Sequence, residues 1–305
     1  MKIRCQESVD NLTAMTESES EPSPDPSPEP GPEPVTGRPT PALSFGAVAA
    51  AYDRARPSYP SEAAAWLVGT ERGQLLELGA GTGKLTEQLV SLGHRVVATD
   101  PLDEMLRHLA GRLPGTPVAR AAAERIPLRA RSVDAVVGAQ AFHWFDLDRA
   151  LPEIARVLRP GGRLALVWNL RDERIPWVKR LGALIGSQEQ QNDPTHALLS
   201  SHLFGFVETA TFRFWQPLDR DRLRDLVASR SNIAMMSAIE REQVLRKVDE
   251  LYAEYGRGAD GMLLPYVTQC YKAVVRPPAL DTEDDPHPHA SDDGGDADAL
   301  LIDFQ

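Results

Sequence analysis

From residue 74 onward, short apolar runs alternate with longer stretches in which apolar residues recur at helical spacing. Short runs rich in Val, Leu and Ala are typical of buried strands, and the amphipathic stretches are typical of helices. The alternation therefore predicts parallel strands joined by crossover helices. The predicted strands are 74–78, 95–99, 116–119, 133–138 and 164–168, and the predicted helices between them are 84–92, 103–112 and 149–158.

Pro152 constrains the last of these helices. Proline has no N–H to donate, so it fits a helix only within the first turn, where N–H groups have no intrahelical partner. We therefore expect this helix to begin no earlier than about Asp148. The residues at 159–162, Arg-Pro-Gly-Gly, predict a turn before the strand at 164–168.

The alternation changes after Asn169, and two helical segments, 45–52 and 61–68, precede the first strand. Ser237 and Glu240 have the spacing of a capping box at a helix start. The later elements predicted are helices at 175–185, 222–228 and 237–252, a strand pair or edge strand at 204–214, and a late strand at 266–275. The predicted fold is a Rossmann-like, doubly wound α/β sheet, mostly parallel with a late antiparallel strand and flanked by helices.

The acidity of the chain, whose formal net charge is −11, belongs to its two ends. Residues 1–42 hold eight acidic and three basic residues, and residues 277–305 hold nine acidic residues and no Lys or Arg. The first end also places a proline at every second position of 21–34. Such segments cannot bury enough apolar area to fold. We predict disordered tails at 1–42 and 277–305 around one domain, 43–276, with a cofactor-binding half at 43–169 and substrate-side additions at 170–276.

Composition excludes several classes of protein. Two cysteines, Cys5 and Cys270, are too few for a disulfide framework or a thiolate metal site, and we predict no metal. No apolar run approaches the roughly 18 residues of a membrane-spanning helix, and because no apolar region follows the first basic residues we expect no secretory signal. The near-neutral middle carries no basic stripe. We therefore expect a cytoplasmic monomer or homodimer with no nucleic-acid or membrane partner.

A loop with three alternate glycines, Gly79, Gly81 and Gly83, follows the first predicted strand. Ligands of open α/β sheets bind at this edge, where glycines let the backbone approach them closely. A phosphate-binding P-loop is excluded because leucines stand where its first glycine and its Ser or Thr should be. A dinucleotide-binding loop is disfavoured because Gly83 comes one residue early and Glu77 would repel a pyrophosphate.

The segment Glu77-Leu78-Gly79-Ala80-Gly81-Thr82-Gly83 resembles the first motif, E/D-x-G-x-G-x-G, of the class I S-adenosylmethionine-dependent methyltransferases. The resemblance extends over residues 74–168 and implies S-adenosylmethionine as the cofactor. Its amino-acid part and ribose would lie against Gly79, Ala80, Gly81 and Gly83. Glu77 would act near the ammonium and sulfonium groups, through its charge or through water.

Asp100 ends the second predicted strand, at the position where the family's carboxylate accepts the ribose hydroxyls. The alternative role for this residue, capping the next helix, suits Asp103 better. By the same resemblance, Leu102 and Met105 would flank the adenine, although helix packing explains both equally well, and Pro101 is a further candidate for the cofactor site.

Two later segments also match family motifs. In the loop after the third strand, Ala123 would offer its N–H, and Glu124 its carboxylate, to the adenine amino group. Gln140 and Ala141 begin a segment that lines the substrate mouth in the family. His143 in that segment is a candidate general base, because its ordinary pKa near about 6.5 suits proton transfer. The alternative for His143 is a position in the pocket wall, and a carboxylate acceptor would need no base.

The segment 45–60 is similar to the N-terminal lead of a subgroup that includes trans-aconitate methyltransferase-like enzymes. In that subgroup an aromatic residue and an Arg-Pro-x-Tyr-Pro turn fold over the cofactor. The similarity makes Tyr52, Arg56 and Tyr59 candidates for a lid. A helix that packs on the sheet and ends at Pro57 is the alternative.

The resemblance implies transfer of a methyl group from S-adenosylmethionine to a small-molecule acceptor. We expect oxygen as the acceptor atom and an in-line displacement, for which the protein mainly aligns the acceptor and excludes water. Two alternatives are an NAD-type oxidoreductase and a non-catalytic cofactor-binding scaffold protein whose tails recruit partners.

Overall fold

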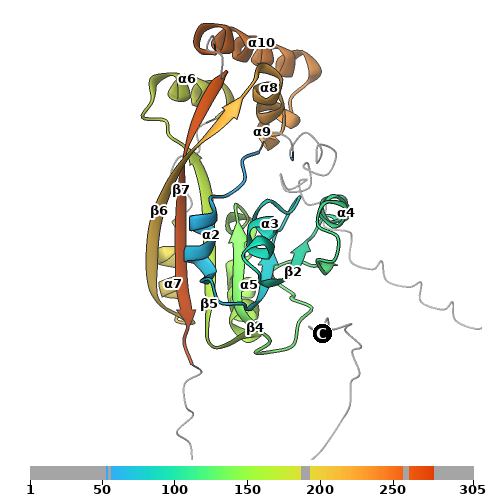
Figure 1. Ribbon diagram of the computed structural model, residues 1–305, viewed down its shortest axis with the longest axis vertical. Coiled ribbons are helices and arrows are strands. Elements are labelled where there is room, and N and C mark those ends of the chain that lie inside the picture. Colours follow the sequence, from blue (N-terminus) through green and yellow to red (C-terminus); the bar gives the residue numbers. More distant parts are fainter. Residues whose placement is uncertain (1–52, 54–55, 187–192, 257–260, 278–305) are drawn as a thin grey trace, which may run out of the picture. The chain divides into compact units, whose positions relative to one another are not determined.

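The computed structural model describes residues 53, 56–186, 193–256 and 261–277. Within them lies a seven-stranded sheet of order β3-β2-β1-β4-β5-β7-β6 (Figure 1). The strands are β1 Gln74–Leu78, β2 Arg95–Asp100, β3 Val118–Arg120, β4 Val133–Ala139, β5 Leu158–Arg171, β6 Phe204–Leu218 and β7 Met262–Val275. β1 to β5 pair in parallel, and β7 is antiparallel to both β5 and β6. The predicted fold class is confirmed.

Helices cover both faces of the sheet. The helices are α2 Ser61–Val68, α3 Lys84–Ser91, α4 Asp103–Arg112, the short 3-10 helix η2 Phe142–Trp144, α5 Leu147–Val157, α6 Pro176–Ile185, α7 Thr195–Ser200, α8 Arg220–Ala228, α9 Ser231–Ala234 and α10 Ala238–Tyr255. Val96 and Ala98 of β2 pack on the face of α2, α3 and α4, and Val97 packs on the face of α5 and α7. The carboxyl ends of the central strands are therefore held between two packed layers.

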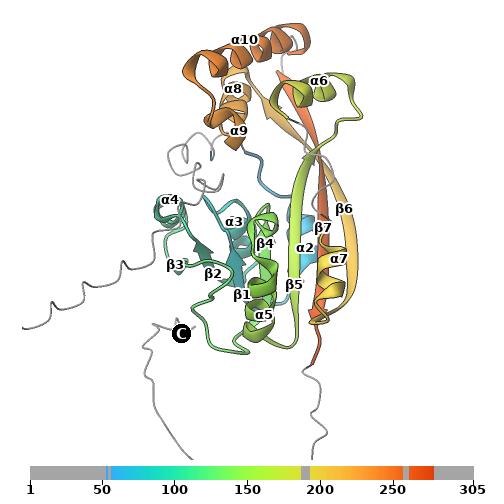
Figure 2. The ribbon, with the colours of Figure 1, turned by 180° about the vertical axis from the view of Figure 1, so that it is seen from behind.

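The C-terminal helices α6, α8, α9 and α10 form a further layer on the ends of β6 and β7 (Figure 2). These two strands continue to pair with each other beyond Tyr266, where the pairing of β7 with β5 stops. The helices bury an apolar cluster of their own against the strand ends, to which Leu181, Leu226 and Val248 contribute. This layer therefore has a core separate from the cores on the two sheet faces.

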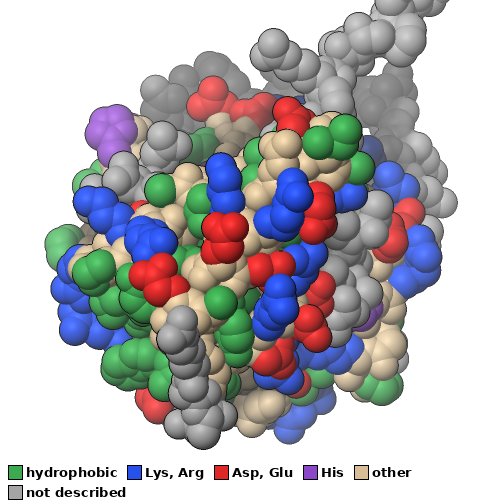
Figure 3. Space-filling model, turned by 90° about the horizontal axis from the view of Figure 1, so that it is seen from above, with side chains coloured by type: hydrophobic (Ala, Val, Ile, Leu, Met, Phe, Trp, Pro, Cys, Tyr) green, Lys and Arg blue, Asp and Glu red, His purple; other side chains and the backbone are tan. Residues whose placement is uncertain are grey.

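The outer surface of this C-terminal layer carries many charged side chains. Acidic and basic side chains are interspersed over it (Figure 3), and the ion pairs there include Arg180 with Glu254 and Arg220 with Asp249. Exposed pairs of this kind contribute little to stability. The apolar cluster therefore holds the layer together.

Several predicted boundaries are corrected by the structure. β3 begins at Val118 and not at 116, because Pro117 has no N–H and only its carbonyl, which accepts from Ala98 N at 2.9 Å, joins the sheet. The turn predicted at 159–162 is an irregularity inside β5, where the register with β4 shifts and Gly161 has φ 79°. The segment predicted as a strand pair or an edge strand is a single edge strand, β6. The short helices α7 and α9 match no predicted element.

One of the two predicted helix caps is present. At the start of α10, Glu240 N donates to Ser237 Oγ at 3.3 Å and Ser237 N donates to Glu240 Oε2 at 3.0 Å, which confirms the capping box. The cap assigned to Asp103 is wrong, because Asp103 is the first helical residue of α4 and pairs with Arg120. The N–H of the preceding Leu102 is accepted by Asp100 instead.

The start predicted for α5 is also wrong. The helix begins at Leu147, which puts Pro152 beyond the first turn and inside the helix. There the proline cannot donate to the carbonyl of Asp148. Pro152 and Asp148 are both exposed, so this carbonyl lies on the solvent side of the helix and the lost bond is tolerated.

Replacing Pro152 with alanine is expected to raise the free energy of unfolding by about 1 kcal/mol, because an N–H donor is restored inside α5. Thermal denaturation would show a rise in Tm of roughly 2–4 °C for a domain of this size. Pro160→Ala is the control, since Pro160 is exposed in the β5 irregularity and blocks no helical hydrogen bond. A lower Tm for Pro152→Ala would contradict the interpretation.

The predicted helix at 45–52, Tyr52 itself and both predicted tails except Pro277 lie outside the described residues. The division into two tails and one domain therefore stays a prediction. In the part of the chain that the structure describes, no helix is long and apolar enough to cross a membrane.

Candidate functional site

The three glycines of the loop after β1 have positive φ angles, 68° at Gly79, 56° at Gly81 and 85° at Gly83. Glycine adopts such angles without the steric penalty of other residues. A Cβ on Gly79 would lie 2.6 Å from Cβ of Ala141, and one on Gly83 would lie 2.9 Å from Cγ of Leu109. A Cβ on Gly81 would meet nothing within 4 Å. Gly79 and Gly83 are thus required for packing, and Gly81 leaves its side of the loop open to a ligand.

Glu77 is an almost completely buried acid beneath this loop, with 1% of its surface exposed. Its Oε2 accepts from Thr86 Oγ1 at 2.6 Å, and its Oε1 has no hydrogen-bond partner among the described residues. Burial raises the pKa of Glu77 to about 8, the Thr86 bond opposes the rise, and the charge of Asp100 adds to it. A positive group beside Oε1 would favour the ionised carboxylate, so this acid is suited to a cationic ligand.

Asp100 joins the glycine loop to the end of β2. Its Oδ2 accepts from Gly81 N and its Oδ1 from Leu102 N, both at 2.9 Å. Burial raises the pKa of this carboxyl, against the effect of the two backbone donors. Asp100 therefore orders the loop, and its carboxylate also lines a cavity.

Two adjoining cavities meet at the glycine loop and share Gly79, Gly81, Ala139 and Gln140 as walls. The first, which we name the apolar cavity, holds about 880 Å³ of empty space, part of it open to solvent. Its wall contains these further residues that the sequence predicts for the cofactor site: Asp100, Pro101, Leu102, Met105, Ala123, Glu124 and Ala141.

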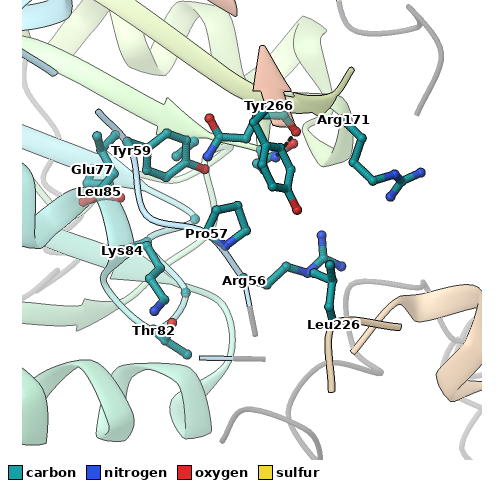
Figure 4. A pocket seen from close by; sticks show the side chains of 16 residues that line it. Arg56, Pro57, Tyr59, Glu77, Thr82, Lys84, Leu85, Arg171, Leu226 and Tyr266 are labelled. Carbon is teal, nitrogen blue, oxygen red and sulfur yellow. Dashed lines mark hydrogen bonds between the residues drawn. The ribbon is translucent and has the colours of Figure 1, made fainter. Parts of the chain in front are cut away.

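The second, the charged cavity, holds about 600 Å³ of empty space, part of it open to solvent (Figure 4). Besides the shared wall residues, the predicted residues Glu77, Ala80, Arg56 and Tyr59 line it. Arg171 and Tyr266 line it as well, and Figure 4 shows the Tyr266 hydroxyl directed toward the side where Arg56 and Arg171 lie. The structure thus brings the two predicted acids, Glu77 and Asp100, to the walls of two connected cavities.

Two described residues predicted for the site line neither cavity. Gly83 caps α3 and packs on Leu109. His143 is exposed in the 3-10 helix, with its ring 4.7 Å from that of Trp144. Partial burial lowers the pKa of His143. Its role as a base stays a prediction.

The segment from Arg56 to Pro60 contributes Arg56, Pro57 and Tyr59 to the wall of the charged cavity, which the glycine loop also lines. Its middle residue is fixed at two points, since Ser58 O accepts from Asn169 Nδ2 at 3.0 Å and Ser58 Oγ donates to Lys84 O at 3.4 Å. Tyr59 is 8% exposed and packs in the core with α2 and α3. Within this segment, Arg56 is thus a wall residue and Tyr59 a core residue that also touches the cavity.

Sequence reasoning missed Arg171 and Tyr266. Arg171 carries a charge at the carboxyl end of an apolar strand, and that position on an α/β sheet is a usable signal. Tyr266 lies opposite Arg171 in the antiparallel register of β5 and β7. No feature of the sequence predicts that register, so Tyr266 could not be placed at the site.

These features fit a cationic nucleoside ligand. Glu77 Oε1 has no partner in the described chain, and the space beside Gly81 is open. The apolar cavity, with the buried Met105 in its wall, can take a flat ring system next to the carboxylate of Asp100. The residues present therefore fit S-adenosylmethionine.

Comparison with known proteins supports the same ligand. Residues 76–166 match the methyltransferase-domain family. An uncharacterised methyltransferase of Mycobacterium tuberculosis is 47% identical over 237 residues, which cover 77% of this chain and 96% of that protein. An uncharacterised methyltransferase-like protein of Schizosaccharomyces pombe is 34% identical over 239 residues, covering 74% and 93%.

Solved structures agree at the level of the fold. A protein of Anaeromyxobacter dehalogenans assigned as a type II methyltransferase has a TM-score of 0.51 and 26% identity, covering 72% of this chain and 97% of that one. A protein of Anabaena variabilis assigned as a methyltransferase from an antibiotic biosynthesis pathway has a TM-score of 0.51 and 20% identity, covering 69% and 95%. An NAD-type oxidoreductase is not favoured, and the narrower trans-aconitate-like subgroup stays a prediction. The chain belongs to the class I S-adenosylmethionine-dependent methyltransferases.

Proposed function

We propose that this enzyme methylates an oxygen atom of a small molecule by in-line displacement. S-Adenosylmethionine, when bound, supplies a methyl group already activated on a sulfonium centre. The observation that carries the proposal is the pair of connected cavities. Their shared wall is the glycine loop, with the Glu77 carboxyl on one side and the Asp100 carboxylate on the other.

In this proposal the apolar cavity holds the cofactor's nucleoside and the charged cavity holds the acceptor. Asp100, Met105 and Ala123 would hold the nucleoside in the apolar cavity. Glu77 would face its positive groups. The segment that contains Arg56 would exclude water from the acceptor, which enters the charged cavity.

Titration calorimetry tests the cofactor assignment. The full chain is expected to bind S-adenosylhomocysteine and to show no heat of binding with NADH. Binding of NADH alone would overturn the proposal. Transfer of label from methyl-labelled S-adenosylmethionine to a panel of small acceptors then tests the reaction, and turnover with nitrogen or carbon acceptors only would overturn the choice of oxygen.

His143→Ala is expected to keep kcat within about fivefold of the wild-type value, because the ring lies outside both cavities, whereas a general base contributes about 10²–10⁴-fold. The pH profile of kcat should keep its shape. His196→Ala, which replaces a histidine remote from both cavities, is the control. A hundredfold loss together with a flattened profile would instead identify His143 as the base.

A further inference from the structure

Asn169 is a polar residue buried near the carboxyl end of an apolar strand. It follows Trp168 in β5, is 1% exposed and lines the charged cavity. A buried amide is costly unless its donors and acceptors are paired. Its Oδ1 accepts from Thr268 Oγ1 at 2.7 Å, and its Nδ2 donates to Ser58 O at 3.0 Å. Both ends of the side-chain amide therefore have a partner.

The two partners determine which way this amide points. Ser58 O can only accept, so the NH₂ group of Asn169 must face it, and the amide oxygen then faces the hydroxyl of Thr268. Thr268 lies directly opposite Asn169 in the pairing of β5 with β7 and is completely buried. It lines neither cavity, and its hydroxyl bonds to no other described residue. Thr268 is thus a remote partner that fixes the orientation of a cavity residue.

The backbone of Asn169 also holds Gln140, a residue in the wall that the two cavities share. Gln140 has a φ angle of 55°, in the left-handed region that few residues other than glycine adopt. Such strain persists only where the surroundings fix the residue. Gln140 N donates to Val167 O at 3.0 Å, and its Nε2 donates to Asn169 O at 3.1 Å. Asn169 therefore bonds both to the shared wall and, through Ser58, to the segment 56–60.

We propose that Asn169 is a positioning residue for the ligand site. Through Ser58 it holds the segment 56–60 at the charged cavity, and through Gln140 it holds the wall between the two cavities. The inference rests on the proposed function, in which the positive groups of the cofactor face Glu77 in the charged cavity. A ligand with an amino-acid part should therefore depend on Asn169 much more than a nucleoside without one.

Thr268→Val tests this proposal without changing a cavity wall. Valine has nearly the same shape but no hydroxyl, so the amide of Asn169 loses the partner that fixes it, and ordering the wall again weakens binding. Calorimetry with the full chain compares S-adenosylhomocysteine with 5′-methylthioadenosine, which lacks the amino-acid part. Thr268→Val should weaken the binding of S-adenosylhomocysteine at least fivefold, and Asn169→Ala at least tenfold. Both variants should bind 5′-methylthioadenosine within twofold of wild type.

Two further variants serve as controls. Thr268→Ser keeps the hydroxyl and should restore the wild-type affinity. Thr211→Val makes the same substitution at an exposed position of β6 and should change neither affinity. Melting curves identify a variant that fails to fold, and if Asn169→Ala does so, the comparison of Thr268→Val with Thr268→Ser provides the decision.

Three results would overturn the inference. They are an unchanged affinity for S-adenosylhomocysteine in folded Thr268→Val, an equal loss of affinity for both ligands, which a merely structural role would produce, and a Thr268→Ser protein that binds as weakly as Thr268→Val. If the wild-type chain binds no S-adenosylhomocysteine at all, the proposed function itself fails, whatever these variants do.

Discussion

Replacement of Asp100 by alanine is expected to weaken the binding of S-adenosylhomocysteine by more than tenfold. The carboxylate lines the apolar cavity and also accepts from Gly81 N and Leu102 N. Its removal therefore deletes a charged acceptor for the ligand, and a hydrogen bond to a charged group contributes roughly 1.5–3 kcal/mol. It also leaves the N–H of Gly81 in the glycine loop without its acceptor. Titration calorimetry measures the change in dissociation constant directly.

Two further variants separate binding from folding. Asp103→Ala removes an exposed carboxylate three residues away that pairs with Arg120, and it should leave the dissociation constant within twofold. Asp100→Asn keeps the shape but replaces one acceptor oxygen with an NH₂ group facing a backbone donor, so it should also bind weakly. An unchanged dissociation constant in a folded Asp100→Ala protein would remove Asp100 from the binding site.

Glu77→Gln is expected to change stability and binding in opposite directions. Burial raises the pKa of Glu77 from its ordinary 4.5 to about 8. Between these values the folded protein holds a proton that the unfolded chain has lost, so the free energy of unfolding falls as the pH rises from 4.5 toward 8. Glutamine resembles the protonated acid. Without ligand, the free energy of unfolding of the variant at pH 7.5 should therefore exceed that of wild type by an amount on the order of 3 kcal/mol. It should also not fall as the pH rises from 4.5 toward 8.

The same variant should bind S-adenosylhomocysteine at least tenfold more weakly, because it cannot present a negative charge to the ligand's ammonium group. Wild-type affinity should increase as the pH rises toward about 8, while the variant shows a smaller dependence. Melting curves and calorimetry between pH 5.5 and 8.5 measure both effects. Glu104→Gln, an exposed acid on α4, is the control and should follow wild type throughout. A parallel pH slope of stability in Glu77→Gln and wild type would show that Glu77 is not the titrating group.

The parts of the fold that follow from local rules could be predicted from the sequence. The strand at Gln74–Leu78 and the helix at Asp103–Arg112 have the predicted bounds, because apolar periodicity and glycine breaks determine both. The start of α5 could not be predicted. A proline inside a helix is tolerated when the carbonyl four residues before it, which then has no N–H donor, faces solvent. Which side of the helix faces solvent depends on tertiary packing.

The residues that line the apolar cavity could be predicted for a similar reason. Its residues follow strand ends at short spacings, so that Asp100 and Ala123 come to the apolar cavity with the strands that carry them. Two residues that line the charged cavity, Arg171 and Tyr266, could not be predicted. Arg171 and Tyr266 come together through an antiparallel pairing of strands about a hundred residues apart, and no local pattern encodes that pairing.

The C-terminal layer has its own buried cluster and sits on the protruding ends of β6 and β7. Leu226 belongs to that cluster and also touches the charged cavity. Mutations that reshape the pocket from this layer can therefore accumulate in evolution while the glycine loop and its acids stay unchanged. A descendant of this enzyme could acquire a new substrate through mutations in the C-terminal layer, while its binding site for the methyl donor stays unchanged.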